Sequence, residues 1–272
     1  MEWRSNKILE DMVEAATLGQ SLLQSFFGCI KQVEKKEKAG WVTEADRHIE
    51  EEIKRFLRQK GYSFSLLGEE SFQAHHLSWF EGDDPFWILD PIDGTTNFIH
   101  QFPVVAISLA LFHKGVVECA VVCAPLMGQK GEVYTAVRGG GAFVNGERMK
   151  VSNTQSTSLA FLATGFFNED ENQLDHQLKI FSSLVREARG IRRAGSAAYD
   201  LALVARGVFD GFWESGLKPW DTAAGVLLVR EAGGVVVTYH GKEYHPTDLS
   251  LVAGNPVLVR ELSHKIQNIL SI

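Results

Sequence analysis

The 272-residue chain has only three cysteines, no excess of basic residues, and no apolar run long enough to cross a bilayer. The cysteines, Cys29, Cys119 and Cys123, include no Cys-x-x-Cys spacing, and we expect them to be buried apolar residues in a reducing compartment. With 27 Lys+Arg against 34 Asp+Glu, the net charge of −7 lacks the basic excess typical of nucleic-acid-binding proteins. No signal peptide is visible. We therefore expect a cytoplasmic protein with no nucleic-acid partner and no membrane association.

Common nucleophile and nucleotide motifs are also absent. The chain contains no Gly-x-Ser-x-Gly and no Walker Gly-x-x-x-x-Gly-Lys-Ser/Thr pattern. The glycines at 139–141 lack the last glycine of a dinucleotide-binding loop and precede a predicted hairpin turn at Asn145-Gly146. These absences exclude an esterase elbow and a P-loop. They leave anionic substrates open, because bound cations can reverse the local field of an acidic protein.

Helical and strand-like segments alternate along the whole chain. Apolar periodicity predicts helices near residues 8–27, 45–60, 174–188, 196–206, 222–232 and 258–270. Short apolar runs predict strands at 63–67, 86–90, 104–112, 116–123, 132–137, 158–164, 209–214, 235–239 and 251–253. This mixture favours an α+β fold. Because no Pro/Ser-rich linker interrupts the chain, we expect one compact body with two lobes, residues 1–150 and 151–272.

The segment from Trp87 to Phe98 carries the strongest chemical signal. An apolar strand leads to Asp90, and Pro91 and Gly94 predict a turn that brings Asp93 back beside Asp90. Two neighbouring carboxylates repel each other unless a cation lies between them, and oxygen ligands of this kind suit Mg²⁺. The Gly94-Thr95-Thr96 segment offers backbone N–H groups and hydroxyls for an anion. The alternative is that Asp-Pro and Asp-Gly form a connecting turn without chemistry.

Two further acidic residues stand at element boundaries. Glu69 follows the strand that ends near Leu67, and Asp221 opens the helix expected from Thr222. Taken singly, Glu69 could be a solvated loop acid and Asp221 a routine N-cap. Their occurrence together with the Asp90/Asp93 pair favours a shared metal and phosphate-ester site.

These segments resemble the signatures of the inositol monophosphatase family of metal-dependent, lithium-sensitive phosphatases. Trp87–Phe98 matches W-x-x-D-P-[IL]-D-G-T-x-N-F, and Trp220–Gly225 matches W-D-x-A-A-G and continues into Arg230–Gly234. The other three matches are Val42–Asp46, Gly68–Ser71 and Arg193–Ala198. Five motifs in the family's order imply its fold, a layered αβαβα sandwich of the sugar-phosphatase type.

The resemblance also implies roles for individual residues. Glu69, Asp90 and the carbonyl of Ile92 would hold one Mg²⁺, and Asp90, Asp93 and Asp221 a second, with two or three ions in each site. Thr95, Asp46 and Glu69 would position the attacking water, while Gly94 and Thr95 would hold phosphate oxygens. The positions implied to meet the substrate's polyol ring are Gly195, Ser196, Ala197, Glu214 and Asp221. Thr43-x-x-Asp46 could instead, or in addition, be a capping pair of the second helix.

The implied reaction is Mg²⁺-dependent hydrolysis of inositol monophosphate to myo-inositol and phosphate. Such ions can activate water and neutralise charge on the leaving oxygen. Fructose-1,6-bisphosphatase, or another sugar or nucleotide phosphatase of the same family, is the alternative within the fold. A regulatory binding protein on the phosphatase fold is the alternative from another class. The resemblance further implies a small phosphate monoester as ligand, lithium inhibition and a homodimer.

Overall fold

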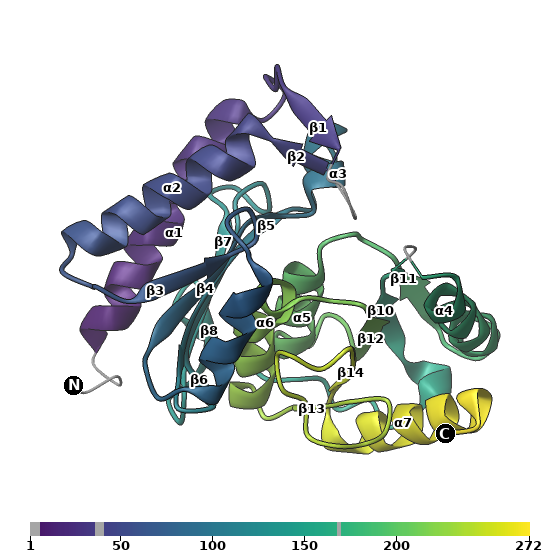
Figure 1. Cartoon of the computed structure of the whole chain (residues 1–272). Helices are drawn as coiled ribbons and strands as arrows, with labels where there is room; N and C mark the ends of the chain where they lie inside the picture. The colour runs from purple at the N-terminus through teal and green to yellow at the C-terminus, as the bar shows by residue number, and fades with distance from the viewer. Residues whose placement is uncertain (1–5, 36–40, 168–169) are drawn as a thin grey trace.

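The computed structural model describes residues 6–35, 41–167 and 170–272. Two amphipathic helices, α1 (Asn6–Phe26) and α2 (Glu44–Gln59), pack against each other and form the outer layer at the N-terminal side (Figure 1). Their apolar faces are buried, with Met12 of α1 and Ile49 and Ile53 of α2 fully inaccessible. A short hairpin of β1 (Val33–Lys35) and β2 (Trp41–Thr43) leads into α2.

A seven-stranded sheet lies beneath these helices. Its order is β3-β4-β5-β6-β7-β8-β9, with β3 and β4 parallel and every other pair antiparallel. All eight residues of β4 are buried, as expected for a central strand covered on both faces. The strands are β3 (Ser65–Gly68), β4 (Phe86–Asp93), β5 (Ala106–His113), β6 (Val116–Ala124), β7 (Glu132–Val137), β8 (Gly141–Val144) and β9 (Glu147–Arg148). The predicted turn at Asn145-Gly146 joins β8 to β9, and both residues have positive φ, 48° and 84°.

Helices α5 (Ala197–Ala205) and α6 (Pro219–Glu231) form the middle layer. They pack on each other, on β5 and β6 of the large sheet, and on β14 of the second sheet. The second sheet has the order β11-β10-β12-β14-β13. Its strands are β10 (Phe161–Thr164), β11 (Gly190–Arg192), β12 (Gly211–Ser215), β13 (Val235–Val237) and β14 (Ser250–Gly254).

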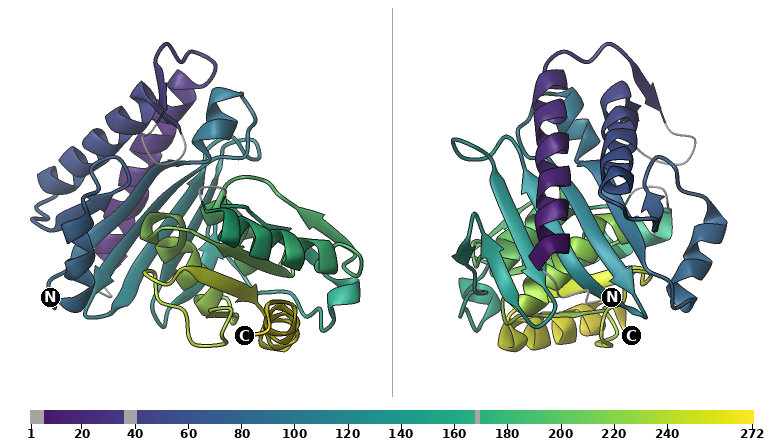
Figure 2. Two further views of the ribbon diagram at one scale, coloured as in Figure 1. Left: turned by 45° about the vertical axis from the view of Figure 1, so that its right-hand side comes forward. Right: turned by 90° about the vertical axis from the view of Figure 1, so that its left-hand side faces the viewer.

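The last layer consists of α4 (Glu171–Leu184) and α7 (Pro256–Leu270), which pack on each other and on the second sheet (Figure 2). The architecture is therefore the expected αβαβα sandwich. The large sheet uses residues before 150 and the small sheet residues after it, while α5 and α6 touch both. The division into lobes at residue 150 stays an interpretation. No helix within the described ranges is both long and apolar enough to cross a membrane.

Several sequence predictions were wrong in detail. A 3-10 turn at Thr157–Leu159 replaces the start of the strand predicted at 158–164. Helix α4 begins three residues earlier than predicted, because Asp170 caps it by accepting from the amide of Gln173, and it ends four residues earlier than predicted. Cys119 and Cys123 are buried as expected, but Cys29 is exposed, because it lies in the turn that follows the end of α1.

Candidate active site

The two aspartates of β4 are brought together by a bulge in the strand. Asp90 pairs with Ser108 and Asp93 with Ala106, so three steps along β4 oppose two along β5. Pro91 fits this irregularity because it has no N–H to donate to the ladder. The prediction of a turn after Asp90 was therefore wrong: the strand continues to Asp93. The expectation that Asp93 lies beside Asp90 is nevertheless confirmed, because carboxylate oxygens of the two residues lie within 4.8 Å of each other.

Asp221 completes a group of three carboxylates. Oxygen atoms of Asp90, Asp93 and Asp221 all lie within 4.8 Å of one another. Helix α6 begins at Pro219, not at Thr222 as predicted, because proline is well suited to the first helical position. Asp221 is therefore the third residue of the helix and not its N-cap. Its Oδ2 accepts a hydrogen bond of 2.6 Å from the amide of Lys218.

Glu69 belongs electrostatically to the same group. Its amide donates to the carbonyl of Leu89 in β4, which places it next to Asp90 across the parallel β3/β4 pair. Burial raises the pKa of Asp90 well above its usual range, and the charges of Glu69, Asp93 and Asp221 raise it further. Burial and the charges of Asp93 and Glu69 likewise raise the pKa of Asp221. Carboxylates this close are stable in ionised form only with a cation, and an all-oxygen donor set fits Mg²⁺.

Glu50, to which the sequence assigned no role, positions the segment that carries Glu69. Its Oε2 accepts a hydrogen bond of 3.0 Å from the amide of Glu70. A Cβ on Gly68 would overlap the Glu50 carboxylate, so any larger residue at that position would displace the Glu50 side chain. Glu50 is almost fully buried on α2. The apolar spacing of the helix predicted at 45–60 indicates only that Glu50 lies near the apolar face, and it does not indicate the contact with Glu70.

Thr95 and Asp46 form a second pair beside the acidic group. The Thr95 hydroxyl lies 3.1 Å from Oδ1 of Asp46 and 3.1 Å from the carbonyl oxygen of Ile92. The other oxygen of Asp46 accepts from the amide of Thr43 at 2.8 Å and from its hydroxyl at 2.6 Å. The predicted capping box of α2 is therefore present, and Asp46 also reaches Thr95. Burial raises the pKa of Asp46 to about 6 despite the hydrogen bonds from Thr43.

The N-terminus of α5 is directed at Asp93. Oδ2 of Asp93 accepts hydrogen bonds of 2.7 Å from the Ser196 hydroxyl and 2.7 Å from the Ala198 amide. Burial raises the pKa of Asp93 to about 6, and these donors oppose the rise together with the amide of Ala197. The sequence implied that Ser196 and Ala197 meet a substrate ring. The structure shows that both support a carboxylate of the acidic group, and their contact with a substrate ring stays a prediction.

Gly94 and Gly195 lie against each other. Gly94 has φ +97°, and a Cβ there would meet the carbonyl oxygens of Val104 at 3.0 Å and Gly195 at 3.1 Å. Asn97 joins the same segments, because its side-chain amide donates to the carbonyls of Val104 and Ala194 at 2.8 Å each. The sequence motif contained Asn97, but only the fold shows which segments it links.

Glu214 lies on β12 at the edge of this group. Burial and the charge of Asp200 together raise its pKa to about 8, although the charge of Arg193 opposes the rise. A Cβ on Gly165 would overlap the Glu214 carboxylate. The roles of Asp200, Arg193 and Gly165 were not visible in the sequence, because they depend on the packing of α5 and β10 against β12.

The comparisons with known proteins agree with this geometry. The profile of the inositol monophosphatase family matches residues 5–271. The chain belongs to the inositol monophosphatase family. As a member, the chain has the family's fold, and its class of enzyme is that of the metal-dependent phosphatases.

Relatives of this family member carry two kinds of name. The chain is 44% identical over 237 residues to Nus factor SuhB of Pseudomonas aeruginosa, covering 86% of each. It is 36% identical over 248 residues to the inositol monophosphatase of Dictyostelium discoideum, covering 90% of this chain and 89% of the relative. The solved structure of suhB from Bartonella henselae superposes with a TM-score of 0.88 at 36% identity, covering 96% and 99% of the two chains. The IMPase of Thermotoga maritima gives a TM-score of 0.87 at 33% identity, covering 97% and 98%.

Proposed function

We propose that this chain is a Mg²⁺-dependent phosphatase that hydrolyses inositol monophosphate to myo-inositol and phosphate. One observation carries the proposal: three carboxylates lie within 4.8 Å of one another, and the Thr95–Asp46 pair stands beside them. Phosphate-ester hydrolysis needs such a combination, since it requires neutralised charge and an oriented water.

The metal ligands would be divided as the family resemblance implies. Glu69, Asp90 and the Ile92 carbonyl would hold one ion, and Asp90, Asp93 and Asp221 another. When bound, the ions would neutralise charge on the ester and lower the pKa of water. Two or three ions would be present in each site.

The chain's own groups would orient the reactants. When the Thr95 hydroxyl donates to Asp46, its lone pairs can accept a hydrogen from the attacking water, with Glu69 as a second acceptor. The amides of Gly94 and Thr95 would bind phosphate oxygens. Water adds to phosphorus, the ester P–O bond breaks, and the departing oxygen takes a proton to become the alcohol.

The polyol side of the ester would face the segment Gly195, Ser196 and Ala197, together with Glu214 and Asp221. The Glu214 carboxyl group can hydrogen-bond two ring hydroxyls in either protonation state, since the carboxylate accepts from both and the protonated form accepts from one and donates to the other. Burial keeps it in a low-dielectric setting, where such bonds discriminate strongly between alcohols that match and alcohols that do not.

Phosphate release from a panel of esters tests the proposal. Inositol 1-phosphate, fructose 1,6-bisphosphate, adenosine 3′,5′-bisphosphate and histidinol phosphate would each be assayed with Mg²⁺ and with EDTA. We expect Mg²⁺-dependent release that is fastest from inositol 1-phosphate. A preference for a different ester would keep the site and replace the substrate with that of another sugar or nucleotide phosphatase. No release from any ester would overturn the proposal.

A Nus factor role is the second candidate, favoured by the name of the relative that is 44% identical. It would make the chain a regulatory binding protein, with or without turnover. A variant without phosphatase activity separates the two roles: cells carrying Asp93→Asn in place of the natural chain would keep a Nus factor phenotype and lose inositol phosphate hydrolysis.

The proposal extends to a homodimer in the cytoplasm that is inhibited by lithium, as the resemblance implies. Sedimentation analysis would give twice the 30.2 kDa chain mass for the dimer. Lithium would lower the rate of phosphate release at fixed Mg²⁺.

A further inference from the structure

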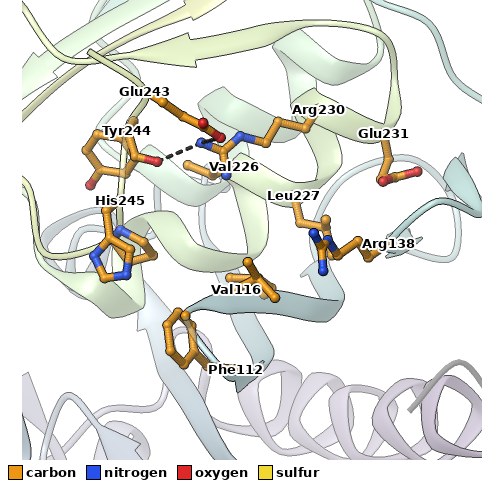
Figure 3. A pocket seen from close by; sticks show the side chains of 13 residues that line it. Phe112, Val116, Arg138, Val226, Leu227, Arg230, Glu231, Glu243, Tyr244 and His245 are labelled. Atoms are coloured by element: carbon orange, nitrogen blue, oxygen red, sulfur yellow. Dashed lines mark hydrogen bonds and ion pairs between the residues drawn. The ribbon is translucent and has the colours of Figure 1, made fainter. Parts of the chain in front are cut away.

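A cavity of about 420 Å³ lies away from the acidic group, between the β5/β6 turn, the end of α6 and the segment that follows β13 (Figure 3). Phe112 pairs with Phe86 at one end of the β4/β5 ladder, whereas Ala106 pairs with Asp93 at the other. Six residues of extended strand separate the two ends by about 20 Å. Asp221 and Arg230 likewise stand at opposite ends of α6. The cavity is therefore not an extension of the candidate active site.

Two arginines line this cavity. Arg230 comes from the last turn of α6 and Arg138 from the end of β7, and their side chains are 34% and 48% exposed. Burial lowers the pKa of Arg230; Glu243 opposes this shift, and the charge of Arg138 adds to it. Two guanidinium groups that repel each other at the wall of one cavity favour an anion between them.

The acidic neighbours of the two arginines leave room for such an anion. Glu231 is engaged elsewhere, because it accepts hydrogen bonds from the amides of Gly139 and Gly141 at 2.7 and 2.8 Å. Glu243 lies 3.3 Å from Arg230, but its side chain is 84% exposed, so solvent screens this ion pair. Glu118 is 3.8 Å from Arg138, at the long end of an ion pair.

Arg230 is held in place by a contact that leaves most of its donors unused. Its Nη2 donates a hydrogen bond of 2.6 Å to the carbonyl of Tyr244, which fixes the guanidinium at the cavity wall (Figure 3). A guanidinium has five N–H donors, so others remain for a ligand. His245 also lines the cavity, and its Nδ1 lies 2.8 Å from the Thr247 hydroxyl and 3.3 Å from the Thr247 amide; in the tautomer whose Nδ1 accepts from both, Nε2 carries the ring hydrogen.

The rest of the lining is apolar. Phe112, Val116, Val226 and Leu227 form an apolar wall, with Phe112 and Val116 on the side away from Arg230, Val226 beside Arg230 and Leu227 beside Arg138 (Figure 3). A volume of 420 Å³ is within the range of ligand sites, about 300–1,000 Å³. An inorganic anion alone would leave this apolar wall exposed, so the cavity suits a ligand with an apolar body as well as a charged head.

We propose that this cavity binds a small organic anion, whose doubly charged phosphate-like head is held by Arg138 and Arg230 and whose compact apolar body lies against Phe112 and Leu227. It would be a second ligand site, independent of turnover. Arg230 belongs to the segment Arg230–Gly234, which continues the second family signature. The proposed hydrolytic reaction assigns no role to this arginine, and the second ligand site would give it one.

Titration calorimetry with phenylphosphonate tests this site, since a phosphatase does not cleave its carbon–phosphorus bond. The 272-residue chain would be measured in EDTA, where the acidic group repels anions. We expect one molecule to bind per chain, and methylphosphonate, which lacks the ring, to bind at least tenfold more weakly. Arg138→Gln and Arg230→Gln should each weaken binding of phenylphosphonate at least tenfold.

Two control variants locate the binding. Arg47→Gln removes an arginine that is paired with Glu34 on the surface and should leave the affinity unchanged. Asp93→Asn should also leave it unchanged. Absence of binding to the natural chain, or binding that survives Arg138→Gln but is altered by Asp93→Asn, would overturn the proposal. If Arg230→Gln fails to fold, the half-exposed Arg138 decides the question alone. None of these outcomes depends on whether inositol phosphate is hydrolysed.

Discussion

The hydroxyl of Ser196 donates a hydrogen bond of 2.7 Å to Oδ2 of Asp93, and so joins the start of α5 to the end of β4 across 103 residues of sequence. The bond favours the ionised form of Asp93, which is the form that binds a metal. Ser196 therefore acts on the proposed metal site through Asp93, whatever contact it also makes with substrate.

Replacing Ser196 with alanine should weaken the use of Mg²⁺ more than it slows the reaction. Loss of a hydrogen bond to a buried charge costs about 1.5–3 kcal/mol. We expect the half-saturating Mg²⁺ concentration for phosphate release to rise about tenfold, with the rate at saturating Mg²⁺ within about threefold of normal. Ser158→Ala, which changes an exposed serine, is the matched control. An unchanged Mg²⁺ dependence would contradict the role of Ser196.

Asp93→Asn should separate metal binding from folding. The amide oxygen can still accept from Ser196 and Ala198, but one ligand charge is lost. We expect most activity to disappear at low Mg²⁺. Because the variant also removes repulsion with Asp90 and Asp221, its thermal midpoint in EDTA should equal or exceed that of the natural chain. Normal rates at low Mg²⁺ would refute the assignment of Asp93 as a metal ligand.

The metal-free protein should lose stability as the pH rises. Burial raises the folded-state pKa values of Asp46 and Asp93 from 3.8 to about 6, so the folded chain binds more protons than the unfolded chain between these values. Their contribution is complete below about pH 4 and is lost as the pH passes through 6. Glu214, with a pKa of about 8, extends the same trend upward.

Thermal unfolding at about pH 5 and about pH 8 measures this effect. A tenfold difference in a proton-binding constant between the folded and unfolded chains corresponds to about 1.4 kcal/mol of stability. We therefore expect the midpoint in EDTA to fall by at least about 5 °C between the two pH values. Saturating Mg²⁺ should stabilise the chain more at the higher pH, because its ligands are then ionised. A midpoint in EDTA that rises with pH would show that these carboxylates are not destabilised by burial.

Gly94→Ala should destabilise the chain through crowding as well as through backbone strain. The matched control is Gly233→Ala, since Gly233 has φ +85° but no atom within 4 Å of the added Cβ. We expect the control substitution to lower the free energy of unfolding by about 1–2 kcal/mol. The change at Gly94 should cost about 2 kcal/mol more, because the new Cβ meets the carbonyls of Val104 and Gly195. Urea unfolding measures both. Equal losses of unfolding free energy in the two variants would show that the segments around Val104 and Gly195 move away from the added Cβ at no cost.

The local parts of the site could be predicted from the sequence, and the long-range parts could not. The Thr43/Asp46 capping box depends on residues three positions apart, so its spacing identified it. The bulge at Pro91 was misread as a turn, because proline is common in both and only pairing with β5 distinguishes them. The start of α6 was placed three residues late, since Asp221 resembles an N-cap when Pro219 is overlooked.

Supporting residues were missed for a different reason. Glu50, Asp200 and Gly165 act on groups that come from other elements of the fold, and no local spacing records such a contact. The family signatures identified the carboxylates themselves, whereas the groups that set their ionisation required the packed structure.

The distribution of the three carboxylates along the chain has a consequence for its synthesis. Asp90 and Asp93 leave the ribosome well before Asp221, which closes the group from α6. Because domains form progressively as the chain emerges, the large sheet can be assembled around an acidic pair whose third member does not yet exist. A chain released before Asp221 would lack most of α6, which packs on β5 and β6, and would leave that face of the large sheet uncovered. Premature termination should therefore yield unstable fragments that proteolysis removes, not partly active enzyme.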